Sequence, residues 1–265
     1  MSRIEQFSTF LLFKSFIHTL HFVLYTIHSA AMAMTMILVE GFLLSSTGVL
    51  LMILFEFGLS SDDVQRFRSR DGGKELHAAG VFATIFNHLV FGPITYYLTV
   101  KYGFIQQHDR VLWQQLYSIV MFLLIENGLY WVAHYLMHTR RLYWMHRFHH
   151  KFNSIVLPSS ASAVSAPEFI MAYMTPFVFA AWGASCDKTS AVIAVLMIMA
   201  ANLIIHTPAL EERFAKYMPW LFVSPGDHLA HHRQLTGHYS APIFHFDRIV
   251  ESLKKVTHGF HRKSE

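Results

Sequence analysis

The chain has 265 residues, of which 53% are apolar and only 14% are charged, whereas about 25% of the residues of a typical soluble domain carry a charge. This balance argues against a water-soluble protein and favours one that is embedded in a bilayer. The single cysteine, Cys186, excludes an intramolecular disulfide and a cysteine-based zinc site. The net charge of +4 does not require a nucleic acid partner, because the basic residues flank apolar segments, where they can meet anionic headgroups.

Apolar segments recur along the chain. A membrane-spanning helix needs about 20 mostly apolar residues, and six segments approach or exceed that length: 7–29, 32–58, 79–100, 113–136, 169–184 and 190–206. The last two are short, and the polar residues between them predict a tight hairpin. We therefore expect an all-α integral membrane protein with about four to six membrane helices.

The stretches between these segments carry the charge. Basic residues concentrate in 59–77, in 137–168 and after residue 206, whereas the intervening loops hold only Lys101, Arg110 and Lys188. When the six segments are threaded alternately through a bilayer, the three basic stretches fall on one side. The positive-inside rule makes that side cytosolic, so we expect a cytosolic helical cap there.

Histidines gather in the same stretches in a repeated pattern. The spacing H-x-x-H-H occurs as HRFHH at 146–150 and as HLAHH at 228–232, and the helix end YWVAHYLMH adds an H-x-x-x-H pair. Residues three and four apart share a face of a helix, so each motif is predicted to present its imidazoles to roughly one side. The eight residues are His134, His138, His146, His149, His150, His228, His231 and His232.

Clustered imidazoles beside a membrane need hydrogen-bond partners or metal ions. Buried imidazoles without hydrogen bonds cost on the order of several kcal/mol, and protonated ones repel one another. Neutral imidazoles around metal ions avoid both penalties, because each donates a lone pair. One zinc ion takes four ligands, so eight histidines indicate two ions, with iron, copper, nickel and zinc all open. His206, just before Pro208 and at the depth of His134, is a ninth candidate, and His238 remains open.

The other histidines and the nearby carboxylates are expected to play supporting parts. His88, beside Asn87, is predicted to make a structural hydrogen bond. The rest are expected to be interfacial or packed (His18, His21, His28) or solvated (His77, His108, His258, His261). The carboxylates that could orient metal-bound rings are, in order of preference, Asp227 and Asp247, then Glu126 and Glu168.

Together these motifs resemble the fatty acid hydroxylase / sterol desaturase superfamily of membrane di-iron oxygenases. LYWVAHYLMHTRRLYWMHRFHH is similar to the family's aromatic helix end and second histidine cluster, and SPGDHLAHHRQLTGHYSAPIFHFDRI is similar to its C-terminal cluster. The resemblance covers roughly residues 80–255, and His206 falls where the family has a further metal histidine. The chain length and HYSAPIFHFD are most similar to the cholesterol 25-hydroxylase and sterol C4-methyl oxidase branch. Departures at Tyr135, His238, Phe246 and Glu251-Ser252 remove no candidate ligand but put the substrate branch in doubt.

The resemblance implies an O2-dependent oxidoreductase that hydroxylates or desaturates a lipid, first of all a sterol, with a sphingolipid or fatty acid as the alternative. It implies two iron ions, which zinc could replace, held by the nine histidines. The chain has no nicotinamide, flavin or cytochrome b5 motif, so electrons are expected from a separate cytochrome b5 or reductase. Residues 1–78 would form N-terminal membrane segments and a basic loop, and 79–265 the catalytic region.

Other readings remain open. A membrane haem protein would use single histidines that face each other on different spans, and a transport or scaffold protein could hold zinc in the same clusters. A hydrolytic metalloenzyme is disfavoured, because H-E-x-x-H is absent. Arg140, Arg141 and Arg147 suit either an acidic electron donor or lipid headgroups. The tail 262–265 resembles a dibasic retrieval signal, which in a eukaryote would place the protein in the endoplasmic reticulum.

Overall fold

Helices make up the regular structure of the computed structural model, which describes residues 3–106, 108 and 110–261. In chain order they are α1 (Arg3–Leu59), α2 (Ser61–Arg68), α3 (Gly73–Phe86), η1 (Asn87–Phe91), α4 (Gly92–Lys101), α5 (Leu112–Met137), α6 (Tyr143–His146), η2 (His149–Lys151), η3 (Pro158–Ser160), α7 (Ala166–Glu168), η4 (Phe169–Met174), α8 (Thr175–Ala184), α9 (Lys188–Ile205), η5 (Pro208–Leu210), α10 (Glu211–Tyr217), α11 (Pro225–Gln234) and α12 (Phe246–His261). Of these, η1 and η4 are π-helical turns within longer helices. The described residues form no strand, only two isolated bridges. The expected all-α fold is confirmed.

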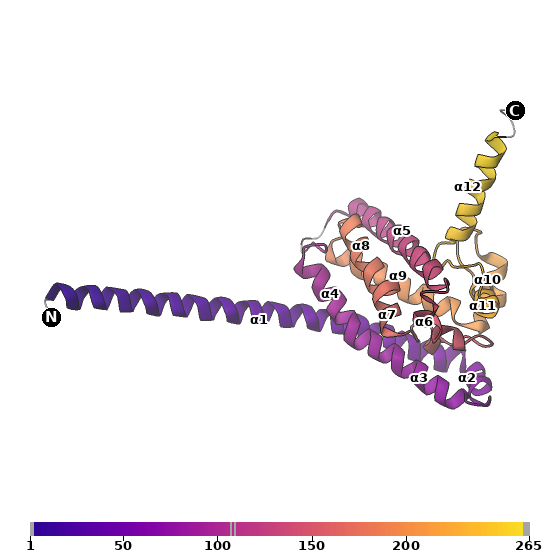
Figure 1. Ribbon diagram of the computed structural model, residues 1–265, viewed down its shortest axis with the longest axis horizontal. Helices are drawn as coiled ribbons and strands as arrows, with labels where there is room; N and C mark the ends of the chain where they lie inside the picture. The colour runs from indigo at the N-terminus through magenta and orange to yellow at the C-terminus, as the bar shows by residue number, and fades with distance from the viewer. Residues whose placement is uncertain (1–2, 107, 109, 262–265) are drawn as a thin grey trace.

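Four helices are long and apolar enough to cross a membrane, and they form the body of the bundle (Figure 1). They are His28–Leu59, Gly73–Lys101, Leu112–Met137 and Lys188–Ile205. α1 packs along α4, and α5 packs against α8 and α9. Large apolar side chains such as Leu54, Phe57 and Trp113 are exposed on the outer faces, where lipid can cover them. These features mark an integral membrane protein.

The first two predicted spans are one helix. α1 continues through the junction His28-Ser29-Ala30-Ala31-Met32, because these five residues include neither glycine nor proline and because alanine and methionine favour the helix. The prediction of separate segments at 7–29 and 32–58 is therefore wrong. The three basic stretches, 59–77, 137–168 and the residues after 206, nevertheless lie on one side as expected. Their helices α2, α6, α10 and α11 are all at the same end of the bundle (Figure 1).

The fifth predicted span, 169–184, is helical but is not among the four span-length apolar helices within the described ranges. Pro176 interrupts its apolar character, and Glu168 precedes it directly. The run of α7, η4 and α8 still packs against α5. A tight turn at Ser185, with φ of 48°, joins it to α9.

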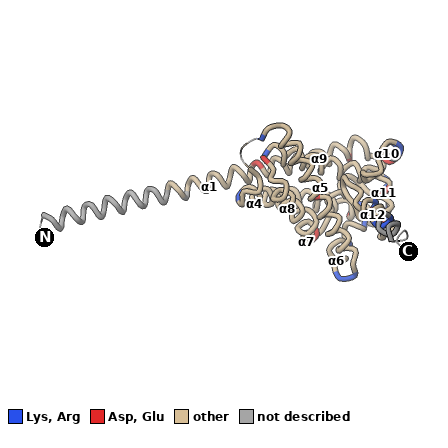
Figure 2. The backbone as a smooth tube through the Cα atoms, turned by 90° about the horizontal axis from the view of Figure 1, so that it is seen from above, with Lys and Arg blue, Asp and Glu red and all other residues tan. Residues whose placement is uncertain are grey.

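The helices of the polar cap occupy one end of the bundle, where α5 and α9 finish (Figures 1 and 2). α11 begins with a capping box, in which the Ser224 hydroxyl accepts from the Asp227 amide (3.1 Å) and the Asp227 carboxylate accepts from the Ser224 amide (3.2 Å). This cap starts the helix at Pro225 and so fixes the direction in which HLAHH projects. The predicted retrieval signal at 262–265 lies outside the described residues.

Candidate metal centre

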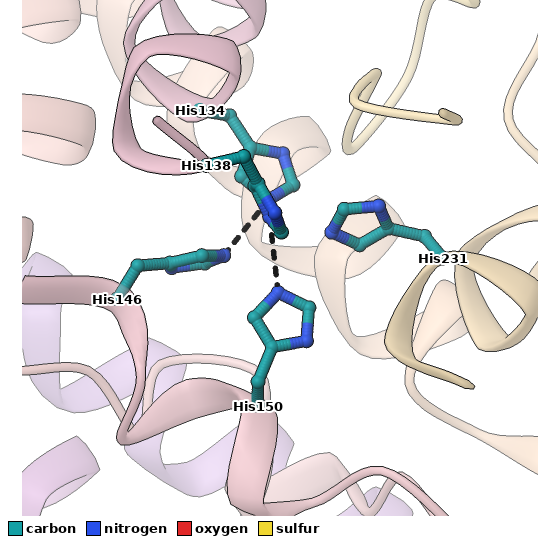
Figure 3. Close-up of side chains that lie close together, drawn as sticks. All are labelled: His134, His138, His146, His150 and His231. Atoms are coloured by element: carbon teal, nitrogen blue, oxygen red, sulfur yellow. Dashed lines mark hydrogen bonds between the residues drawn. The ribbon is translucent and has the colours of Figure 1, made fainter. Parts of the chain in front are cut away.

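All nine histidines selected by their spacing lie together at the cap end of the bundle, in two groups. The five-histidine group contains His134, His138, His146, His150 and His231, and the four-histidine group contains His149, His206, His228 and His232. Within each group, one ring nitrogen of every member lies within 4.8 Å of the others. Figure 3 shows the rings of the five-histidine group converging from α5, α6, η2 and α11.

Each H-x-x-H-H motif is divided between the two groups. The outer histidines of HRFHH enter the five-histidine group, whereas His149 enters the other. The outer histidines of HLAHH enter the four-histidine group, whereas His231 enters the other. The expectation that each motif faces one side is therefore wrong. HLAHH lies on α11, where successive residues point about 100° apart, and HRFHH runs from the end of α6 into the 3-10 turn η2. In both motifs the histidine at the fourth position therefore reaches a different centre from the histidines at the first and fifth positions.

The ring nitrogens are spaced like ligands of a single ion. The Nε2–Nε2 distances are 3.0 Å for His134–His146 and His206–His228, and 3.1 Å for His138–His150 and His228–His232. Two nitrogens at about 2.1 Å from one metal ion, with an angle of about 90–110° between them, lie about 3.0–3.4 Å apart. The separations therefore match metal coordination.

Backbone carbonyls decide which nitrogen of three rings carries the proton. The Nδ1–O distances are 2.7 Å for His134 to Tyr239, 2.7 Å for His206 to Asn202 and 2.8 Å for His231 to Gly237. Because a carbonyl only accepts, each Nδ1 donates, and each Nε2 keeps its lone pair. These lone pairs lie inside the groups, where a metal ion can accept several of them at once.

His146 has a carboxyl group as its outer partner. Its Nδ1 lies 2.5 Å from Oε1 of Glu168, and both side chains are buried. Ser165 caps the helical run at this point by accepting a hydrogen bond from the Glu168 amide. Burial raises the pKa of the Glu168 carboxyl well above its ordinary value, and a cation held by the adjacent rings would oppose that rise. A carboxylate behind a ligand imidazole orients the ring and increases its basicity.

Of the nine candidate histidines, the eight that lie outside the spans are held in the neutral form by burial. Burial disfavours the charged ring and lowers the pKa to about 4 for His138, His206 and His231, and to about 2 for His150. Burial first, and then neighbouring histidines, hold the pKa well below its ordinary value for His146, His149, His228 and His232. Neutral imidazole is the form that binds a metal ion.

Several ring nitrogens of the nine histidines are buried and have no hydrogen-bond partner among the described residues. They are Nε2 of His231 and Nδ1 of His149, His150, His228 and His232. A buried polar atom without a partner costs roughly 1–3 kcal/mol. For Nε2 of His231, which must accept, an ion in the five-histidine group removes that cost. The donor set and its spacing therefore fit one metal ion in each group, and imidazole donors suit iron, copper, nickel or zinc.

The four carboxylates rank differently from the expected order. Glu168, placed among the last, is the one that contacts a ring of either group. Within the described ranges, no hydrogen bond joins Asp227, Asp247 or Glu126 to the nine histidines. Their partners are Ser224 and Arg248 for Asp227, Trp131 and Ser240 for Asp247, and Asn127 for Glu126. Asp227 and Asp247 therefore support the backbone around the site, since they accept from the amides of Ser224 and Ser240.

His238 lies outside both groups. Its Nδ1 is 3.8 Å from Oδ1 of Asp227, and Nε2 of the buried His245 is 3.7 Å from Oδ2 of the same carboxylate. Sequence reasoning missed His245 because it stands alone in a loop, outside any repeated spacing.

The remaining histidines divide as follows. His77 is not solvated as predicted, because its Nε2 lies 2.6 Å from Oε1 of Glu56. His88 makes the predicted structural hydrogen bond, from Nδ1 to the Thr84 carbonyl at 2.9 Å. His28 and His108 are exposed, and the side chains of His18, His21, His258 and His261 lie outside the description.

An apolar cavity lies beneath the histidine groups, between α1, α4, α5, α8 and α9. It has about 980 Å³ of empty space, which includes the open solvent at its mouth. Asn202 and Leu203 in its wall precede His206 by about one helical turn, and Phe169 in its wall follows Glu168. The cavity therefore approaches both groups.

Comparison with known proteins supports the same region. The model of the family described as fatty acid hydroxylase matches residues 119–252, which is just over half of the chain. This segment contains all nine histidines and Glu168. No curated protein and no solved structure matches the chain.

Proposed function

The chain belongs to the fatty acid hydroxylase family, and on that premise we propose that it is a membrane di-iron oxidoreductase that uses O2 to hydroxylate or desaturate a lipid. The observation that carries the proposal is the convergence of nine histidines on two adjacent centres above an apolar cavity. The similarity of HYSAPIFHFD to the sterol branch favours a sterol as the lipid.

Each centre has a defined set of donors under this proposal. The five-histidine group would hold one iron ion and the four-histidine group the other. When bound, the two ions supply the redox chemistry that combines O2, two electrons and two protons with a C–H bond, giving an alcohol and one water, or an alkene and two waters in a desaturation.

The residues of the chain prepare this chemistry by orientation and exclusion. The carbonyls of Tyr239, Asn202 and Gly237 hold three rings with Nε2 turned inward, and Glu168 holds His146. Burial of the rings keeps bulk water away, which protects reactive species from side reactions. The cavity would hold the lipid with the carbon to be oxidised at its upper end.

We propose that the two electrons per turnover come from another protein, cytochrome b5 or a similar reductase, which docks on the cap. Exposed Arg140 and Arg141 lie in the turn between His138 and α6, which is blue in Figure 2, and Arg147 follows α6. They offer an acidic partner a complementary surface beside the five-histidine group.

The same positive charge supports a cytosolic position for the cap, in the endoplasmic reticulum if the cell is eukaryotic. Residues 79–265 would form the catalytic region. Residues 1–78 would anchor it and complete the cavity, since Leu44, Gly48 and Met52 line its wall.

Lipid mass spectrometry tests the function. Cells that produce the protein are compared with cells that produce His149→Ala or His108→Ala, the latter an exposed control. We expect a lipid that gains one oxygen atom or loses two hydrogen atoms with the wild type and with His108→Ala, but not with His149→Ala. Identical lipid profiles in all three, at equal protein levels and with metal bound, would exclude an oxygenase. A Soret band in the purified protein would point to haem instead.

A further inference from the structure

Most polar side chains in the wall of the cavity already bind the protein. Five of them donate hydrogen bonds within the chain: Thr84 to Ser159 O, Thr95 to Phe91 O, Tyr96 to Glu40, Tyr173 to Ala161 O and Asn202 to Ala161 O. Each of these side chains thus has one polar group engaged within the chain, and the rest of the wall is mostly apolar. Two side chains differ from these five.

His88 keeps a free acceptor at the wall. Its Nδ1 donates to the Thr84 carbonyl, which leaves Nε2 with a lone pair, and Nε2 makes no hydrogen bond within the described part of the chain. The π-helical turn η1 carries the ring, and Gly48 of α1 makes room for it, since a Cβ at that position would lie 2.9 Å from Cδ2 of His88. The ring is thus fixed as an acceptor that a donor group of a guest can use.

Glu126 is the second such residue. Its Oε2 accepts a hydrogen bond from Nδ2 of Asn127 at 2.8 Å. No hydrogen bond to Oε1 occurs among the described residues, although the side chain is 4% exposed and lines the cavity. The hydroxyls of Ser45 and Ser162 lie in the same wall.

His88 and Glu126 lie at a similar depth below the metal centre. Glu126 precedes His134 by eight residues of α5, which corresponds to about 12 Å at 1.5 Å per residue. A Cβ on Gly48, which would touch His88, would also lie 3.1 Å from Sδ of Met199, and Met199 precedes His206 by seven residues of α9, or about 10 Å. A polar group bound here therefore sits about 10–12 Å from the histidine level.

The chemistry of the wall limits what that polar group can be. Neither lysine nor arginine lines the cavity in the described chain, so an anionic headgroup would be buried without a counter-charge at a large cost. Nε2 of His88 can only accept, so the guest must donate. A hydroxyl meets both requirements, whereas a ketone, an ester or an ether does not.

We propose that His88 and Glu126 form a hydroxyl-recognition subsite, which selects a sterol alcohol whose hydroxyl binds about 10–12 Å from the carbon that is oxidised. The inference rests on the proposed function, in that it takes the cavity to be the lipid site. It goes beyond the family match, because His88 and Gly48 lie outside residues 119–252.

Equilibrium binding tests the subsite without turnover. Metal-loaded protein in phosphatidylcholine nanodiscs, without O2 or reductant, is titrated with radiolabelled cholesterol and with its 3-O-methyl ether. We expect the ether to bind the wild type about tenfold more weakly, as does cholesterol to His88→Leu, because each loses one buried hydrogen bond. The ether should bind His88→Leu and the wild type equally, since the hydrogen bond is already absent. Glu126→Gln should also weaken cholesterol binding.

His108→Leu is the matched control, because this histidine is exposed and does not line the cavity, and the variant should bind both probes like the wild type. Equal binding of cholesterol and its ether by the wild type would overturn the subsite. It would also be overturned if the losses of affinity caused by the ether and by His88→Leu were additive. Absence of cholesterol binding would overturn it as well, while metal content and lipid oxidation in cells would still report on the proposed function. A general loss of folding in His88→Leu would weaken the binding of cholesterol and of the ether alike, whereas loss of the hydroxyl contact weakens the binding of cholesterol alone.

Discussion

Nδ1 of His146 lies 2.5 Å from Oε1 of Glu168, and both side chains are buried. Glu168 immediately precedes η4, whose Phe169 and Tyr173 line the cavity. One carboxyl group thus connects the five-histidine group to the helix beside the lipid site. This contact makes the metal centre sensitive to a residue that donates no ligand atom itself.

The first prediction concerns this contact. Glu168→Leu should weaken metal binding to the five-histidine group by about 10–100-fold, because the His146 ring loses its outer acceptor. Glu168→Gln keeps an acceptor oxygen and should retain most of the affinity. Competition with a chelator, followed by metal analysis, measures both. The exposed Glu251→Gln is the control, and wild-type affinity in Glu168→Leu would show that the contact does not support the metal.

Metal stoichiometry tests the division of the motifs. The wild type should hold two ions per chain, and a double variant His149→Ala/His232→Ala should hold about one, because both residues belong to the four-histidine group. The double variant His149→Ala/His150→Ala removes neighbours in sequence but one ligand from each group, and should weaken both sites. If the two double variants lose metal identically, the histidines are not partitioned as the geometry indicates.

Acid should destabilise the metal-free protein from an unusually high pH. His206 and His231 are buried with a pKa of about 4, whereas the unfolded residue titrates near 6.5. Between pH 4 and 6.5 these histidines are protonated in the unfolded chain but not in the folded chain. The free energy of unfolding that is present above about pH 6.5 is therefore lost as the pH falls towards 4. Each residue contributes about 1.4 kcal/mol per pH unit in this window.

Chemical unfolding of the metal-free protein at pH 7, 6 and 5 measures this dependence. The variant His231→Asn should show a shallower slope than the wild type, and His108→Ala the same slope. A stability that is flat between pH 7 and 5 would contradict neutral, buried rings.

Asn127 should be a stability determinant of the site. Its Oδ1 accepts from the amides of Ile243 (2.8 Å) and Phe244 (3.3 Å), and so ties the C-terminal segment to α5. Asn127→Ala leaves two backbone donors without a partner, which should cost about 2–5 kcal/mol. Thermal unfolding in detergent measures the loss, with the outward-facing Leu116→Ala as control. Unchanged stability would mean that the segment is held elsewhere.

Sequence patterns predicted the membrane helices better than their junctions. Apolar runs locate α3 to α5 and α9, because the bilayer demands length and hydrophobicity that few other segments have. The predicted break near residue 30 failed because polar His28 and Ser29 resemble a loop in composition, although nothing there stops a helix. The supporting role of Glu168 was ranked low because no spacing links it to His146, 22 residues away in the chain.

The sequence by itself predicted the nine histidines that the structure brings together, because they follow from helical spacing and from the ends of apolar segments. Only the tertiary structure decided which histidines share a centre, since that depends on how α5, α6, α9 and α11 meet at the cap. His149 and His231 each lie in a different group from the other two histidines of their own motif. The physical reason is that one residue turns a helical side chain by about 100°, so a motif placed between two centres supplies both.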